Sequence, residues 1–125
     1  MEGYEIKIIE SSQELSARDR LRLKDLSNAI SLDREIKENE SLAITPTAYV
    51  ILAVHNEKSD NKDYKNYVIS DDVTGHKYYT GSESFFTSFR DIWEEMKEEG
   101  EYQIEISKKP SKNYTGKYFL TCSIL

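Results

Sequence analysis

The feature that most limits the possible fold of this 125-residue sequence is a change in the spacing of its apolar residues near residue 80. Before it, the apolar and β-branched run Tyr49–Val54 predicts a buried strand. The segments Tyr64–Ser70 and His76–Thr80 predict two more strands. After it, apolar residues recur at helical i, i+3 and i+4 spacing from Phe85 to Met96. Three strands followed by one amphipathic helix are therefore predicted.

Two further strand-like segments follow the predicted helix. Tyr102, Ile104 and Ile106 alternate with polar residues, and Tyr118–Leu125 is a mainly apolar run after a polar loop at 108–117. The resulting order, β-β-β-α-β-β, is that of an OB-fold, a five-stranded barrel with a helix at one end. The sequence thus predicts a mainly β fold with helix, built on a five-stranded OB-fold barrel.

Turn and capping residues predict where these elements begin and end. The segment Asp71–Gly75 is typical of a tight turn between the second and third strands, and 55–63 of a longer loop. Thr80 or Ser82 is the predicted N-cap of the helix, and Gly100 is expected just beyond its C-terminus.

The chain is predicted to form one domain, residues 1–125, in which residues 1–45 are an extension packed on an OB-fold core at 46–125. This extension is expected to contain a short strand at Tyr4–Ile9 and a short helix at Ser31–Asn39.

The segment at 17–24 is compatible with two structures. Arg18, Arg20, Arg22 and Lys24 occupy every second position, so a strand would place them on one face. A helix would distribute them around its axis instead. The strict alternation favours a strand, and a helix is the alternative.

Composition and motifs argue against several classes of protein. Cys122 is the single cysteine, so no internal disulfide and no cysteine-based zinc site is possible. With two histidines and no recognisable nucleophile motif, we expect no metal, no cofactor and no enzymatic activity. The sequence also lacks a membrane-length apolar run and a signal peptide, so we predict a cytoplasmic protein without a membrane partner.

The net charge of −6 weighs against nucleic-acid binding, because proteins that bind nucleic acids are usually basic. The charge is uneven along the chain, however. Residues 81–100 hold six acids and two bases, whereas residues 101–125 hold two acids and four bases. The basic C-terminal segment is therefore compatible with a nucleic-acid interface.

Basic residues interleaved with tyrosines lie where an OB-fold binds single strands, on its second and third strands and in two of its loops. Lysine and arginine would contact phosphates, and tyrosine would stack on bases. Packing within the sheet is the alternative role for each tyrosine, and simple solvation for each lysine. The predicted nucleic-acid-binding residues on these elements are Lys58, Lys62, Lys65, Tyr67, Lys77, Tyr78, Tyr79, Lys108, Lys109, Lys112, Tyr114 and Lys117. Arg18, Arg20 and Arg22 of the N-terminal extension are predicted to contact phosphates as well.

Four segments, His55–Asp60, Thr80–Phe85, Lys108–Tyr114 and Gly116–Cys122, give the sequence a resemblance to small single-stranded DNA-binding proteins of phages that infect Gram-positive bacteria. It covers about residues 15–125. The resemblance implies an OB-fold, sequence-independent binding of single-stranded DNA, and a role in phage DNA replication or recombination. It also implies phage or host replication and recombination proteins as partners.

The predicted function is therefore sequence-independent binding of single-stranded DNA. The alternative is a protein-interaction module of a phage or mobile element that binds a host factor or belongs to the virion. The acidic segment Asp91–Glu101 favours this alternative. The sequence leaves the oligomeric state open, a homo-oligomer included.

Overall fold

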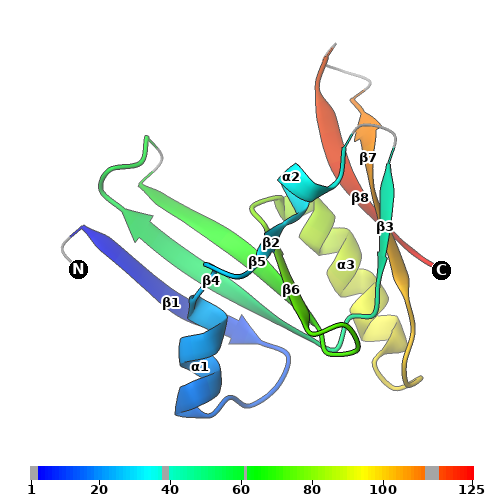
Figure 1. Ribbon diagram of the computed structural model, residues 1–125, viewed down its shortest axis with the longest axis horizontal. Coiled ribbons are helices and arrows are strands. Elements are labelled where there is room, and N and C mark those ends of the chain that lie inside the picture. Colours follow the sequence, from blue (N-terminus) through cyan, green and yellow to red (C-terminus); the bar gives the residue numbers. More distant parts are fainter. Residues whose placement is uncertain (1–2, 38–39, 61, 112–115) are drawn as a thin grey trace.

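The computed structural model describes residues 3–37, 40–60, 62–111 and 116–125 (Figure 1). The described chain forms two β-sheets, with three helices packed on or between them. In chain order the elements are β1 (Tyr4–Ser11), α1 (Ala17–Lys24), β2 (Ile30–Ser31), α2 (Leu32–Glu35), β3 (Ser41–Ile44), β4 (Ala48–Asn56), β5 (Asp63–Asp71), β6 (His76–Thr80), α3 (Glu83–Met96), β7 (Ile104–Pro110) and β8 (Tyr118–Ile124).

The mainly β class predicted from the sequence is confirmed, and the predicted strands and helix from residue 49 onward are all present. β4, β5 and β6 form an antiparallel meander. The turn between β5 and β6 is held by Asp71, whose side chain accepts hydrogen bonds from the amides of Val73 and Thr74 at 3.0 and 3.1 Å. Gly75 closes this turn with a φ of 80°, a left-handed conformation that glycine adopts without strain.

The strands form a five-stranded sheet with order β1-β4-β5-β6-β2 and a three-stranded sheet with order β3-β7-β8. Among the described residues these sheets do not close into a barrel, because β6 pairs with β2 and β8 pairs only with β7. The chain passes directly from one sheet to the other between β3 and β4. The buried Thr45 lies at this crossing, where its amide donates to the Asp71 carboxylate at 3.0 Å.

The favoured strand at 17–24 is wrong, since these residues form helix α1. The Ser16 hydroxyl caps the helix by accepting a hydrogen bond from the Asp19 amide at 3.1 Å. Leu23 packs against the apolar cluster of the five-stranded sheet. The alternating arginines misled the prediction because every arginine in α1 is exposed, so their spacing does not report which face is buried.

Several element boundaries also differ from the prediction. Ser82, rather than Thr80, caps α3 by accepting from the Phe85 amide at 3.2 Å. The helix ends at Met96, before the predicted end next to Gly100. The short helix after Ser31 is present as α2 but ends at Glu35, and part of its predicted range lies outside the described residues.

Two apolar clusters lie on opposite faces of the five-stranded sheet. The larger one joins α3 to both sheets and includes Phe85, Phe89, Ile69 and Ile104, all 1% exposed or less. The smaller one lies on the other face, where Val50, Leu52, Val54 and Val68 pack with side chains from the α1 region. Figure 1 shows α3 between the two sheets. No helix in the described part of the chain is long and apolar enough to cross a membrane.

Candidate nucleic-acid interface

Cations from α2, from the segment just after it and from β7 surround one depression in the surface. Arg34, Lys37 and Lys108, with Asp33 and Ile36, line a cavity of about 450 Å³. Lys108 is held there because its Nζ donates to the Asp33 carbonyl oxygen at 2.6 Å. The side chains of Arg34 and Lys37 make no ion pair with any residue that the structure describes. We call Arg34, Lys37 and Lys108 the α2–β7 cations.

The hairpin of β7 and β8 adds further basic and aromatic side chains. Lys109 pairs directly with Phe119 across the two strands, which places both side chains on one face. The Phe119 ring is 44% exposed, and Lys117 is exposed just before β8 begins. Lys108 and Lys109 lie in strand β7, not in a loop as predicted. An exposed ring beside lysines has the chemistry that stacks a base and contacts its phosphate.

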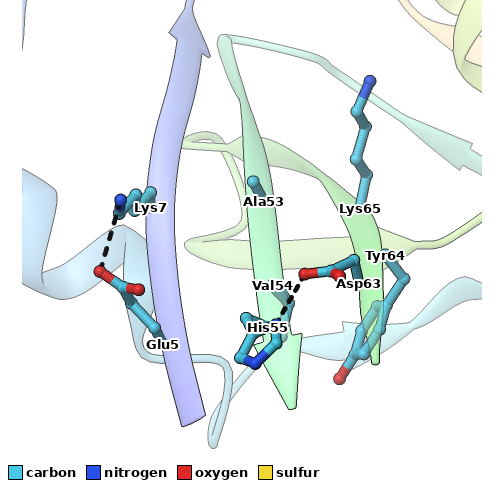
Figure 2. Close-up of a pocket in the computed structure, with 8 residues that line it drawn as sticks. All are labelled: Glu5, Lys7, Ala53, Val54, His55, Asp63, Tyr64 and Lys65. Carbon is cyan, nitrogen blue, oxygen red and sulfur yellow. Dashed lines mark hydrogen bonds and ion pairs between the residues drawn. The ribbon is translucent and has the colours of Figure 1, made fainter. Parts of the chain in front are cut away.

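A second basic region lies on the five-stranded sheet, at the end toward the β4–β5 loop. Lys65 and Lys7 lie on either side of Ala53 and line a cavity of about 430 Å³ (Figure 2). Lys58 and Lys62, which were predicted to lie in a loop, are both exposed in the segment between β4 and β5. The Nζ atom of Lys62 is 3.3 Å from a Glu57 carboxylate oxygen, so that charge is already partly neutralised.

His55 connects the two ends of the β4–β5 loop. Its Nδ1 lies 2.7 Å from Asp63 Oδ1, and its Nε2 lies 2.5 Å from Glu57 Oε1. Because each nitrogen faces a carboxylate, both must donate, which describes the doubly protonated imidazolium. The pKa of His55 is raised above the ordinary histidine value, mainly by the hydrogen bond to Asp63 and next by the one to Glu57. This network was not predicted, although acids flank both ends of the loop in the sequence.

Two of the predicted stacking tyrosines are buried. Tyr67 and Tyr78 are 5% and 4% exposed and belong to the larger core cluster. The Tyr67 ring stacks on Phe86 of α3, with centroids 4.5 Å apart. Tyr79 is half-buried and packs against the smaller cluster. Packing, the alternative role stated for each tyrosine, therefore applies to these rings: the larger cluster covers Tyr67 and Tyr78, and the smaller one covers part of Tyr79.

Lys77 has a structural role that the sequence did not reveal. Its Nζ donates to the carbonyl oxygens of Arg22 and Asp25, each at 2.7 Å, and so binds the C-terminal end of α1. Burial lowers the pKa of Lys77. Its donors are engaged with the helix, so we leave it out of the interface.

The predicted arginines of α1 lie far from the β7–β8 hairpin, at the opposite end of the structure in Figure 1. All three are exposed, and Arg20 also donates from Nη1 to the Leu15 carbonyl oxygen at 2.8 Å. The predicted residues Lys112 and Tyr114 lie outside the described part of the chain. The basic residues therefore form three separate regions and not one groove.

Cys122 packs against the larger core cluster, and burial raises the pKa of its thiol to about 12. It is therefore protonated at neutral pH and a poor nucleophile. Within the described ranges, no three His, Cys, Asp or Glu side chains come together as metal ligands.

No protein-family model, no curated protein and no solved structure matches this chain. What the chain binds is therefore inferred from the geometry of its own side chains.

Proposed function

We propose that the protein binds single-stranded DNA, without sequence preference, along α2 and the β7–β8 hairpin. The observation that carries the proposal is the meeting of cations from two distant segments, Arg34 and Lys37 with Lys108, in one depression. Lys109 and Lys117 add positive charge on the other face of the same hairpin, where Phe119 provides an exposed ring. Phosphates would bind to the cations and a base would stack on the ring, at about 1–3 kcal/mol per stacked base.

We also propose that the fold is an opened OB-fold. In this interpretation β3 and β4 together correspond to a bent first strand, because β3 pairs with β7 while β4 pairs with β5. β5 and β6 would be the second and third strands, and β7 and β8 the fourth and fifth. The β7–β8 loop is then the loop between strands four and five, which binds oligonucleotides in OB-folds. A role in phage DNA replication or recombination, implied by the resemblance, is part of the same proposal.

The test measures binding of a fluorescein-labelled oligothymidine by anisotropy at several salt concentrations. Lys37, Lys109 and Lys117 are changed together to Gln, because none of them has a side-chain partner among the described residues. We expect weaker binding and a slope of log K against log salt that is smaller by about 2, since each lost phosphate contact contributes about 0.7.

The matched control changes Arg18, Arg22 and Lys24 of α1 to Gln, which removes the same charge at the distant end of the molecule. Equal losses in the two triple variants would show that binding follows net charge and would contradict the proposed interface. Phe119→Leu separates stacking from apolar contact, because leucine retains the apolar surface but has no aromatic face.

A second candidate function is the binding of a protein partner, and strand β8 favours it. β8 has a strand neighbour on one side only within the described chain, and no charged residue occurs from Tyr118 to Leu125. Phe119, Ile124 and Leu125 are 44%, 46% and 62% exposed. Exposed edge strands usually carry charges that prevent pairing, so an uncharged edge suits the addition of a partner strand. Absence of salt-sensitive oligothymidine binding would favour this candidate.

A further inference from the structure

Three residues form a row across one face of the five-stranded sheet. Lys7 of β1 lies opposite Ala53 of β4, and Ala53 lies opposite Lys65 of β5. Residues directly opposite each other in antiparallel strands project on the same side of the sheet. Two long cationic side chains therefore flank a single methyl group, as Figure 2 shows. We call Lys7, Ala53 and Lys65 the lysine row.

The small side chain in the middle of this row leaves space above the sheet. The cavity of about 430 Å³ is lined by residues of β1, β4 and β5 only, so α3 does not reach it. Farther along the same face, Ile51 and Tyr67 are covered, and both are 7% exposed or less. At Ala53 the sheet face is open, and the space between the two lysines is large enough for a small polyatomic anion.

A second row, Glu5, His55 and Asp63, lies two residues farther along each strand. Its acids have partners inside the cavity: Glu5 is 3.5 Å from Lys7, and Asp63 is 2.7 Å from His55. Lys65 has no hydrogen bond or ion pair to a described side chain. With His55 protonated, the lining residues hold three positive and two negative charges, and the uncompensated charge is that of Lys65.

We propose that this cavity is an anion-binding site that takes a phosphate-class group above Ala53, between the ammonium groups of Lys7 and Lys65. The lysines supply hydrogen-bond donors and charge, and Ala53 supplies the space. The source of the phosphate depends on the proposed function: a strand phosphodiester if the protein binds DNA, or a free phosphate or phosphomonoester if it does not. The site itself lies outside the β7–β8 hairpin and adds a second contact region.

The site is expected to bind more strongly at lower pH. The groups that face His55 are Glu57 and Asp63 on its two nitrogens, Glu5 opposite it on β1, and Lys62 bound to Glu57. Lys7 and Lys65 occupy the next row. The imidazolium adds one positive charge to the cavity below the raised pKa of His55, and this charge is lost as the pH rises through that pKa.

The experiment titrates inorganic phosphate into the ¹⁵N-labelled full chain and follows the backbone amide signals of Lys7, Ala53 and Lys65 by NMR. We expect saturable shifts at these amides, weakened about three- to fivefold by Lys65→Gln, as is typical for one exposed ionic contact. Lys58→Gln is the matched control, because Lys58 is exposed in the nearby loop but does not line the cavity. Absent or non-saturable shifts, or equal affinity in the Lys65→Gln variant, would overturn the site.

A second variant tests the space without changing the charge. Ala53→Val should abolish the phosphate-dependent shifts, because the larger side chain occupies the volume above the sheet. Valine is favoured in strands, and a thermal unfolding curve checks that the variant folds.

A pH series with sulfate tests the role of His55, because the charge of sulfate is constant near neutrality. Sulfate binding should weaken as the pH rises, and His55→Gln should remove this dependence. Unchanged sulfate binding across the series would contradict the role of His55.

Adding oligothymidine to the same sample separates the two proposals. Shifts both at Ala53 and Lys65 and on the β7–β8 hairpin would identify the strand phosphodiester as the source. Phosphate binding at Ala53 without any oligothymidine binding would support the site and overturn the proposed function. Oligothymidine binding on the hairpin, with the Ala53 amide unaffected by both ligands, would overturn the site alone.

Discussion

Two halves of one sheet face have opposite surroundings, although the same strands run through both. In the covered half, Tyr49, Ile51 and Tyr67 lie beneath α3 and are 7% exposed or less. In the open half, the next residues on the same side of β4 and β5 include Ala53 and Lys65, which line a cavity. Strand alternation is the same in both halves. What differs is the position of α3, which packs on the covered half and does not line the cavity of the open half.

The largest expected effect concerns the covered half. Phe89 is fully buried in α3, and its ring contacts those of Tyr49 and Trp93. Phe89→Ala should lower the free energy of unfolding by about 3–5 kcal/mol, because a cavity replaces the ring. Lys65→Ala in the open half should change it by no more than about 0.5 kcal/mol. Urea denaturation measures both, and similar losses would show that the open half is also part of the core.

A smaller effect is expected from the two aspartates that begin and end β5. Asp71, at the covered end, is 2% exposed and accepts hydrogen bonds from the amides of Thr45, Val73 and Thr74. Asp71→Ala should cost about 1.5–3 kcal/mol, because it leaves these donors without a charged acceptor. Asp63→Ala, at the open end, should cost about 1 kcal/mol or less.

Asp71→Asn is the matched control, since its amide oxygen retains part of the accepting capacity. Chemical denaturation of the three variants gives the comparison. A loss for Asp63→Ala as large as that for Asp71→Ala would mean that the His55 network stabilises the fold as strongly as the buried turn.

The smallest expected effect is a pH dependence in the open half. The carboxylates of Asp63 and Glu57 raise the pKa of His55, so the folded state binds this proton more tightly than the unfolded state does. The resulting stabilisation is present below the ordinary histidine pKa and is lost as the pH rises through the raised one. Asp63→Asn should lower the pKa of His55, as measured by NMR titration of its ring. An unchanged pKa would contradict the hydrogen bond to Asp63.

Some regions of the structure could be predicted from the sequence and others could not, for physical reasons. The strand at 49–54 and the helix around Phe85 and Phe89 were predicted because their apolar spacing matches a buried face. Residues 17–24 were not, because the alternating arginines of α1 are exposed and the Ser16 cap carries the relevant signal. In the candidate interface, Lys109 and Lys117 were predicted from local composition. Arg34 and Lys37 were not, since they meet Lys108 only through the tertiary structure, in which Lys108 Nζ donates to the Asp33 carbonyl oxygen of α2.

The sequence by itself determined the type and order of most elements, because the direction of side chains along a strand or helix depends on local backbone geometry. Only the tertiary structure decided that α3 covers Tyr67 but leaves Ala53 open, and that Lys77 binds the end of α1 while Lys65 remains unpaired among the described residues. These outcomes depend on contacts between residues distant in the chain. Local periodicity contains no information about such contacts, so it identified the candidate residues but not which of them remain at the surface.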